Sequence, residues 1–210
     1  MRYSLLIIAL LTGGLLKSTG AAAQEKRVYT TSGVSLAIPL GNLRAATQNG
    51  WGTSFAAEYR LSKRVSVHGV WDNNKLPVQS AKLLAGLDPA LRTTVTNLKG
   101  TYVSNTLGLF GQYRLTPGKA VQPYLTAGLG FNIITVPAPV YNDQTRLLSL
   151  ESSSVLTLFG AAGAGIHWQL SKSVGVFGEG IVYYTPAKSA VTTGNNSYLT
   201  TKFGVRFPLF

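Results

Sequence analysis

Apolar and polar residues alternate along most of the chain that follows its first segment. In residues 51–61, Trp51, Phe55 and Tyr59 fall on one side of an extended backbone, whereas Ser54 and Glu58 fall on the other. Because successive side chains of a β-strand point to opposite faces, this pattern predicts strands. The alternating runs cover residues 30–39, 51–61, 64–71, 102–115, 121–135, 153–170, 173–184 and 198–209. The sequence therefore predicts an all-β fold with eight strands.

The connections between these runs fall into two classes by length. A motif of an aromatic residue, a polar residue, Leu and a hydroxyl residue ends three runs, at residues 59–63, 113–117 and 168–172, and a short turn follows each. The other connections, residues 41–50, 72–101, 136–152 and 185–197, are longer, and residues 80–95 fit either a short surface helix or a packed loop. Short turns at one end and long loops at the other are typical of outer-membrane β-barrels. We therefore expect an eight-stranded antiparallel up-and-down transmembrane β-barrel.

The distribution of charge favours a barrel whose apolar face points outward. Full charges such as Glu58 and Lys202 stand in mid-strand on the polar face, and the apolar face is bulky where the polar face is often Gly or Ala. An eight-stranded barrel encloses a narrow interior that small and polar side chains suit. Charged residues make up only 12% of the chain, about half the 25% of soluble domains. A soluble, lipocalin-like barrel with its apolar face inside is the alternative.

Aromatic residues gather near the ends of the predicted strands. Membrane barrels place such residues in girdles at the two interfaces of the bilayer. The expected girdle residues are Trp51, Tyr59, Trp71, Tyr113, Trp168, Tyr183, Tyr184 and Phe207.

The first 23 residues have the features of a secretory signal peptide. Arg2 is basic, residues 5–16 are largely apolar, and Ala21, Ala22 and Ala23 form a small-residue cleavage site. A membrane-anchoring helix is the alternative, but the apolar stretch is shorter than the roughly 20 residues that span a bilayer. We expect cleavage to leave residues 24–210 as the barrel domain, exported to the cell outer membrane.

The chain carries a formal net charge of +12. A basic balance can indicate nucleic-acid binding, but an exported chain is not expected to meet nucleic acid. Charge attraction to anionic lipid head groups is the expected alternative, beside an ordinary solvated surface.

The chain resembles the small eight-stranded outer-membrane barrels of the OmpA/OmpX type. The resemblance rests on the signal ending in Ala23, the opening at residues 33–41, the three turn motifs and the closing residues 203–210. It implies insertion by the outer-membrane assembly machinery, which reads a C-terminal aromatic residue, here Phe210. The apolar closing residues stand one step out of the usual register, and Pro208 lies close to the end. We expect a monomer in contact with outer-membrane lipid and lipopolysaccharide. We expect no added peptidoglycan-binding domain.

Strand parity places a set of ionisable residues inside the barrel. These residues are Glu58, Arg60, His68, Arg114, His167, Glu179, Lys202 and Arg206. Charges in a narrow lumen must be paired or hydrated. Two interpretations remain: a salt-bridge network that plugs the barrel, which we favour, or a gated polar path through a narrow pore.

Catalytic chemistry has little support in the sequence. Two families of small barrel enzymes modify lipid A, and the deacylase family needs a Ser two residues after its His, which follows neither His68 nor His167. Ser66 precedes His68 in the reversed order, so a dyad of His68 with Ser66 or Glu58 stays open. The chain has no Cys and no phosphate-binding or calcium-binding loop, so we expect no metal and no cofactor. We expect a non-enzymatic barrel that stabilises the envelope or presents surface loops. The alternatives are a narrow ion or small-solute channel and a lipid A-modifying enzyme.

Overall fold

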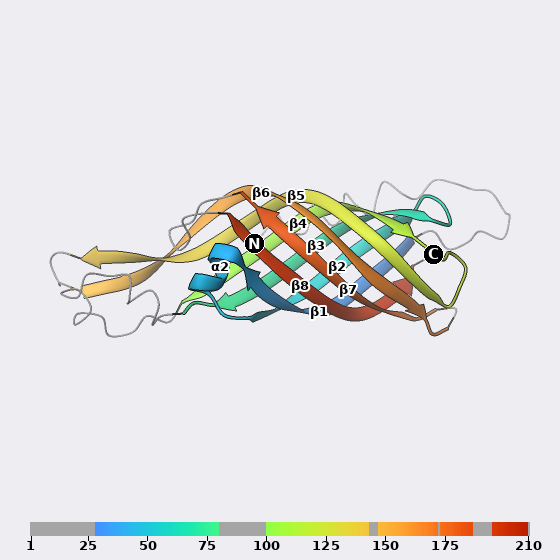
Figure 1. The fold of residues 1–210 in the computed structure, drawn as a ribbon, viewed down its shortest axis with the longest axis horizontal. Helices are drawn as coiled ribbons and strands as arrows, with labels where there is room; N and C mark the ends of the chain where they lie inside the picture. Colours follow the sequence, from blue (N-terminus) through green and yellow to red (C-terminus); the bar gives the residue numbers. More distant parts are fainter. Residues whose placement is uncertain (1–27, 80–99, 143–146, 172, 187–194, 210) are drawn as a thin grey trace.

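Eight antiparallel strands form one closed up-and-down barrel, which confirms the predicted fold class. The computed structural model describes residues 28–79, 100–142, 147–171, 173–186 and 195–209. The strands are β1 (Val28–Leu40), β2 (Gly50–Arg60), β3 (Val65–Pro77), β4 (Thr101–Arg114), β5 (Val121–Asn142), β6 (Leu147–Gln169), β7 (Gly175–Thr185) and β8 (Asn196–Pro208). Each strand pairs with its neighbour in the chain, and β1 pairs with β8 to close the sheet (Figure 1). The predicted signal peptide, the segment 80–95 and Phe210 lie outside the described residues.

The short connections lie together at one end of the barrel, which we call the turn end. Residues 61–64 join β2 to β3, and residues 115–120, with Gly118 at φ 80°, join β4 to β5. The opposite end, which we call the loop end, carries a short helix, α2 (Gly41–Ala46), where the sequence predicted only a loop. Within the described residues, no helix is long and apolar enough to cross a membrane.

The outer wall of the barrel is apolar and its interior holds charge, as the alternation predicted. Leu109 is 64% exposed and Leu129 is 69% exposed, whereas Glu58 and Lys202 are each 1% exposed. Hydrocarbon is the solvent in which such a wall is stable, since outer-membrane barrels face lipid with an apolar band about 25 Å tall. The soluble, lipocalin-like arrangement is therefore wrong.

Tyr183 is a correction to the predicted aromatic girdle. Its side chain is fully buried in the lumen, while the neighbouring Tyr184 is 49% exposed. Adjacent residues of a strand face opposite sides, so both tyrosines cannot belong to one outer girdle. Because the side chain of Tyr184 points outward, that of Tyr183 must point into the lumen.

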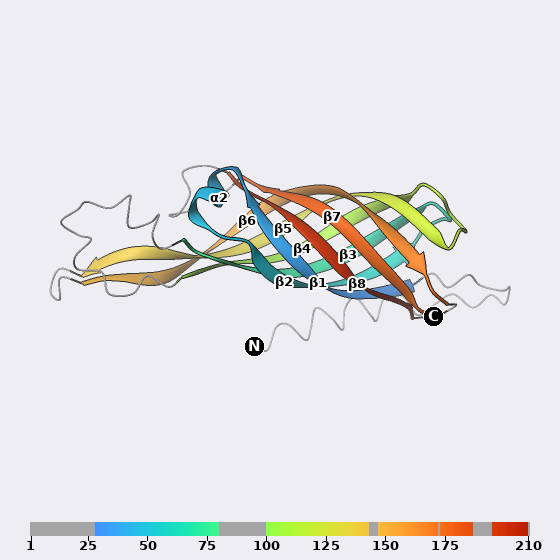
Figure 2. The same cartoon turned by 60° about the horizontal axis from the view of Figure 1, so that its bottom comes forward.

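Three strands, β3, β5 and β6, run much further toward the loop end than the sequence predicted, whereas the others differ by one or two residues. β3 ends at Pro77, so Asp72 and Lys75 belong to a strand rather than to a long loop. β5 and β6 have 22 and 23 residues, and their pairing continues to Asn142 and Leu147. The predicted loop at residues 136–152 is therefore mostly a β-hairpin. This hairpin projects well beyond the rest of the barrel in both views (Figures 1 and 2).

Candidate functional site

The barrel lumen collects the ionisable residues that strand parity selected. Glu58, Arg114, His167, Lys202 and Arg206 are buried there. Arg60, His68 and Glu179 are intermediate in burial and point to the same side of their strands. Asp72 joins them at 0% exposure, although the sequence analysis assigned it to a loop. Asp72 is four residues after His68, so the two side chains face the same side of the strand. The predicted strand ended at Trp71, one residue too early to include Asp72.

Glu58 is the centre of the charge cluster nearer the turn end. One carboxylate oxygen accepts a hydrogen bond from Arg114, and the other lies 2.8 Å from Nε of Arg206. Nε of Arg60 is 3.9 Å from the carboxylate. We call these four residues the Glu58 cluster. They come from β2, β4 and β8, so the cluster ties strands from different sides of the barrel together.

An aromatic ring and a hydroxyl complete the Glu58 cluster. The guanidinium of Arg206 lies 3.5 Å from the centroid of the Tyr29 ring, and that of Arg60 lies 4.5 Å from it. Arg114 also donates to Oγ of Ser66 at 3.2 Å. Three cations around one carboxylate leave this end of the lumen with a positive excess, which the face of the Tyr29 ring partly offsets.

A second cluster lies further toward the loop end, around Lys202. Its ammonium is 2.8 Å from Oδ2 of Asp72 and 3.4 Å from Oε1 of Glu179. The hydroxyl of Tyr183 donates to the same Asp72 oxygen at 2.5 Å. We call Lys202, Asp72, Glu179 and Tyr183 the Lys202 cluster. Buried charges are tolerated when they are paired and hydrogen-bonded in this way.

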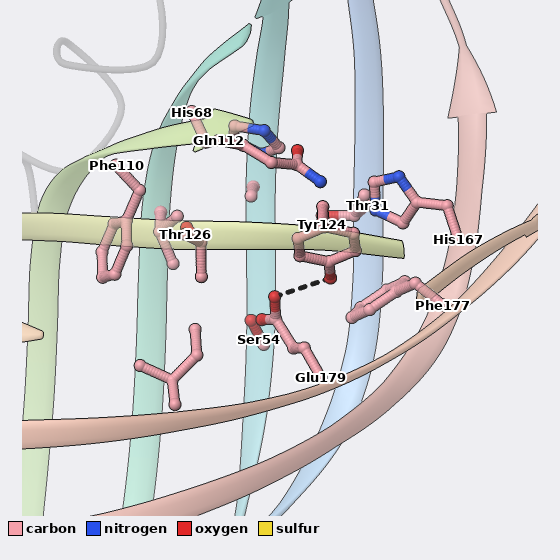
Figure 3. A pocket seen from close by; sticks show the side chains of 13 residues that line it. Thr31, Ser54, His68, Phe110, Gln112, Tyr124, Thr126, His167, Phe177 and Glu179 are labelled. Carbon is pink, nitrogen blue, oxygen red and sulfur yellow. Dashed lines mark hydrogen bonds between the residues drawn. The ribbon is translucent and has the colours of Figure 1, made fainter. Parts of the chain in front are cut away.

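A small cavity of about 30 Å³ lies in the lumen, and residues near both clusters line it, among them His68, His167 and Glu179. Tyr124 and Glu179 face each other across it, joined by a hydrogen bond of 2.9 Å, and His167 and Gln112 point in from other strands (Figure 3). Nε2 of Gln112 and Nδ1 of His167 have no hydrogen-bond partner within the described part of the chain. The volume suits about two water molecules, at roughly 10–15 Å³ each. The cavity is far smaller than the sites of drug-sized ligands, about 300 Å³ or more.

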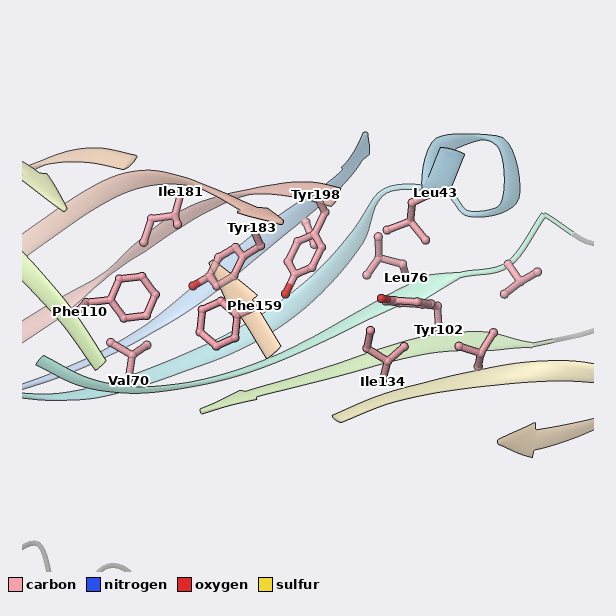
Figure 4. Close-up of a cluster of buried hydrophobic side chains, with 13 residues drawn as sticks. Leu43, Val70, Leu76, Tyr102, Phe110, Ile134, Phe159, Ile181, Tyr183 and Tyr198 are labelled. Atoms are coloured by element: carbon pink, nitrogen blue, oxygen red, sulfur yellow. The ribbon is translucent and has the colours of Figure 1, made fainter. Parts of the chain in front are cut away.

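Aromatic rings fill the lumen around Tyr183 of the Lys202 cluster. The rings of Tyr183 and Tyr198 stack with centroids 5.0 Å apart, and Phe159 lies 5.6 Å from Tyr183. Phe110 completes the group at 6.1 Å from Phe159 (Figure 4). We call Phe110, Phe159, Tyr183 and Tyr198 the aromatic plug.

Buried apolar side chains fill the loop end of the lumen. Leu43 of α2 is fully buried, as are Leu76 and Tyr102, and they belong to one apolar cluster with Ile134 (Figure 4). The backbone N–H of Gln79 donates to the carbonyl of Ala46 at 2.8 Å, which fixes the end of α2 against the barrel. Helix α2 is therefore fixed at the loop end, with Leu43 packed into the apolar cluster.

Inward-facing glycines make room for these rings, which corrects the expected small and polar interior. A Cβ on Gly128 would lie 2.5 Å from a ring carbon of Phe110, and one on Gly165 would lie 2.5 Å from the Tyr124 ring. Real Cβ atoms do not approach so closely, so each glycine is paired with a ring. The sequence analysis correctly placed glycine inside but missed that glycine there accommodates large residues.

Ser66 and His68 form the hydrogen bond that the sequence left open, at 3.0 Å between Oγ and Nε2. Ser66 is fully buried and also contacts Arg114 and Gln112. The hydroxyl of Ser66 is therefore enclosed on the lumen side of the wall. Among the described residues, no group of three His, Cys, Asp or Glu is placed to hold a metal ion.

Comparisons with known proteins identify the class of fold. No family model matches the sequence, and a search of curated proteins finds no significant match. The crystal structure of neisserial surface protein A is similar with a TM-score of 0.58 and 16% identity, over 87% of this chain and 97% of that one. OprG, an outer-membrane protein of Pseudomonas aeruginosa, is similar with a TM-score of 0.51 and 15% identity, over 88% of this chain and 96% of that one. This chain therefore has the fold of the small eight-stranded outer-membrane β-barrels.

Proposed function

We propose that this protein is a non-enzymatic barrel of the outer membrane, closed to solutes, that stabilises the envelope and presents its β5–β6 hairpin outside the bilayer. The observation that supports this most is the filling of the lumen. The Glu58 cluster near the turn end, the Lys202 cluster, the aromatic plug that shares Tyr183 with it, and Leu43 of α2 at the loop end together occupy the lumen. The proposal includes insertion by the outer-membrane assembly machinery as a monomer, in contact with outer-membrane lipid and lipopolysaccharide.

Closure against ions follows from the size and the pairing of the lumen groups. A conducting pore needs a continuous hydrated path, but the described cavity is about 30 Å³ and lies between the two charge clusters. Each of the three described carboxylates in the lumen takes part in at least one ion pair. Opening a path would separate these pairs inside a narrow barrel, at a cost of several kcal/mol for each ion.

Presentation of a surface element rests on the length of the β5–β6 hairpin. β4 pairs with β5 only as far as Thr135, and β7 pairs with β6 only from Gly160 onward. Beyond these points the two strands pair with each other in the described part of the chain. Ser152, Ser153 and Ser154 on β6 are exposed. The backbone of this two-stranded ribbon projects well beyond the barrel (Figure 2), and the exposed serines lie where the ribbon begins, next to the last pair of β5 with β4.

Planar-bilayer recording tests closure. We expect the purified, folded protein to give no stepwise current, and Glu58→Gln to remain silent because the aromatic plug still blocks the path. Phe159→Ala combined with Tyr198→Ala removes two rings of the plug and serves as the opened control. Reproducible current steps from the unaltered protein would contradict the proposal and favour a narrow channel. A changed acyl pattern of lipid A in cells that express the protein would instead favour the enzyme.

Cysteine labelling on intact cells tests presentation of the hairpin. The chain has no cysteine, so a single substitution reports on its own site. A membrane-impermeant maleimide is expected to label Ser153→Cys on intact cells and Lys119→Cys, at the turn end, only after the outer membrane is broken. Both side chains are exposed in the structure. Equal labelling of the two sites on intact cells, or labelling of Lys119→Cys alone, would contradict the proposed arrangement.

A further inference from the structure

Acidic and basic residues are segregated between the two sides of the barrel wall. Every carboxylate whose side chain is described lies in the lumen: Glu58, Asp72 and Glu179. The exposed charged side chains of the described residues are all basic: Arg44, Lys63, Arg64, Lys75 and Lys119. The outer surface of the described barrel is thus apolar with cations at its ends, and no described carboxylate there competes for them.

Three of these cations cluster at the turn end, in two neighbouring hairpins. Lys63 and Arg64 lie in the β2–β3 turn, and Lys119 lies in the β4–β5 turn. The two turns are adjacent because β3 pairs with β4, with Val65 opposite Tyr113. We call Lys63, Arg64 and Lys119 the basic rim.

The basic rim lies directly beside the apolar wall. Nη1 of Arg64 donates to the hydroxyl of Tyr113 at 2.9 Å, and the ring of Tyr113 is 42% exposed. The backbone N–H of Gln169 donates to the carbonyl of Ala120, so Trp168, which is 53% exposed, lies next to the turn that carries Lys119. Tyr and Trp with cations beside an apolar band are the arrangement found at the level of lipid head groups.

From this juxtaposition we propose that the basic rim binds the phosphates of anionic phospholipids in the leaflet at the turn end. This inference rests on the proposed membrane location and adds a lipid preference to it. Cations close to a membrane surface are attracted to anionic lipids, and the attraction adds with each Lys or Arg. Arg64, held by Tyr113, is oriented before a lipid arrives, and a guanidinium forms paired hydrogen bonds with phosphate. The acyl chains of the same lipid would lie against the exposed wall.

Quenching of one tryptophan by brominated lipids measures this preference locally. The chain has three tryptophans, and Trp51→Phe with Trp71→Phe leaves Trp168 beside the basic rim as the reporter. The protein is reconstituted into phosphatidylcholine bilayers that contain brominated phosphatidylglycerol or, at equal mole fraction, brominated phosphatidylcholine. We expect phosphatidylglycerol to be enriched about twofold or more around Trp168, with enrichment that falls as salt rises.

Charge variants separate a local site from net charge. Lys63→Gln, Arg64→Gln and Lys119→Gln together are expected to abolish the enrichment at Trp168. Arg44→Gln with Lys75→Gln, at the loop end, is expected to leave it unchanged. Equal quenching by the two lipids, survival of the excess in the basic-rim variant, or its loss in the loop-end variant would each overturn the inference. Bilayer insertion is checked first by heat-modifiable gel mobility, so failure to insert counts against the proposed function and not against the lipid preference.

Discussion

The two halves of the lumen are filled by different chemistry on the same strands. The half near the turn end is ionic, with Arg114 and Arg206 converging on Glu58 from opposite sides. The half near the loop end is mainly aromatic and aliphatic, from Tyr183, which also hydrogen-bonds Asp72 of the Lys202 cluster, to Leu43 of α2. The ionic half depends on a few specific partners, whereas the aromatic half depends on fitted volume. The comparison teaches that a narrow barrel is closed either by pairing charges or by matching rings to glycines.

The largest expected effect follows removal of the carboxylate at the centre of the ionic half. Glu58→Ala leaves Arg114 and Arg206 buried without their counter-charge, which costs about 3–5 kcal/mol of unfolding free energy. Urea titration of the refolded protein, followed by tryptophan fluorescence, measures the loss. Adding Arg114→Met to the variant removes one orphaned cation and is expected to restore part of the stability. A midpoint equal to that of the unaltered protein would show that the Glu58 cluster is not a structural tie.

A substitution that creates a cavity in the aromatic half is expected to lower the unfolding free energy by somewhat less. Phe159→Ala removes a ring that contacts Phe110 and Tyr183, and we expect a loss of about 3 kcal/mol. The same urea titration measures it. Phe159→Leu, which keeps most of the volume, should lose about half as much. If both variants unfold at the unaltered midpoint, the plug contributes no packing energy.

Overfilling the aromatic half tests the pairing of glycine with a ring. Gly128→Ala brings a methyl group against Phe110, and we expect a loss of about 2 kcal/mol. Gly69→Ala is the matched control, because no atom lies within 4 Å of a Cβ built there. The pairing is refuted if the two variants have the same urea midpoint.

The smallest expected effect concerns a single hydroxyl in the plug. The oxygen of Tyr198 lies 2.9 Å from Oγ of Ser104, and both residues are fully buried. Tyr198→Phe keeps the ring and removes this hydrogen bond, which is worth about 1 kcal/mol. A shift as large as that of Phe159→Ala would mean that polar contacts, and not ring packing, hold this half together.

Strand alternation was sufficient to predict the barrel and most of the charged lumen. Glu58 and Lys202 stand in the middle of long runs, where parity is unambiguous, and the structure places both inside. Asp72 was missed because it follows Trp71, where the visible alternation weakens into a polar stretch. Tyr183 was misplaced because an aromatic residue near a strand end fits a girdle and a plug equally well by type. The pattern could not show that Leu43 of α2 is buried with Leu76, since the two residues come together only when β1, β2 and β3 pair.

The position of apolar side chains relative to lipid tests the inside-out arrangement most directly. Methyl NMR signals are recorded for the reconstituted protein with and without a phospholipid that carries a paramagnetic doxyl group on its acyl chain. Leu109 and Leu129 pair across β4 and β5 and are exposed, whereas Ile181 is 2% exposed inside the lumen. We predict that the doxyl lipid broadens the methyl signals of Leu109 and Leu129 and leaves that of Ile181 sharp. A broadened Ile181 signal beside sharp leucine signals would contradict the account.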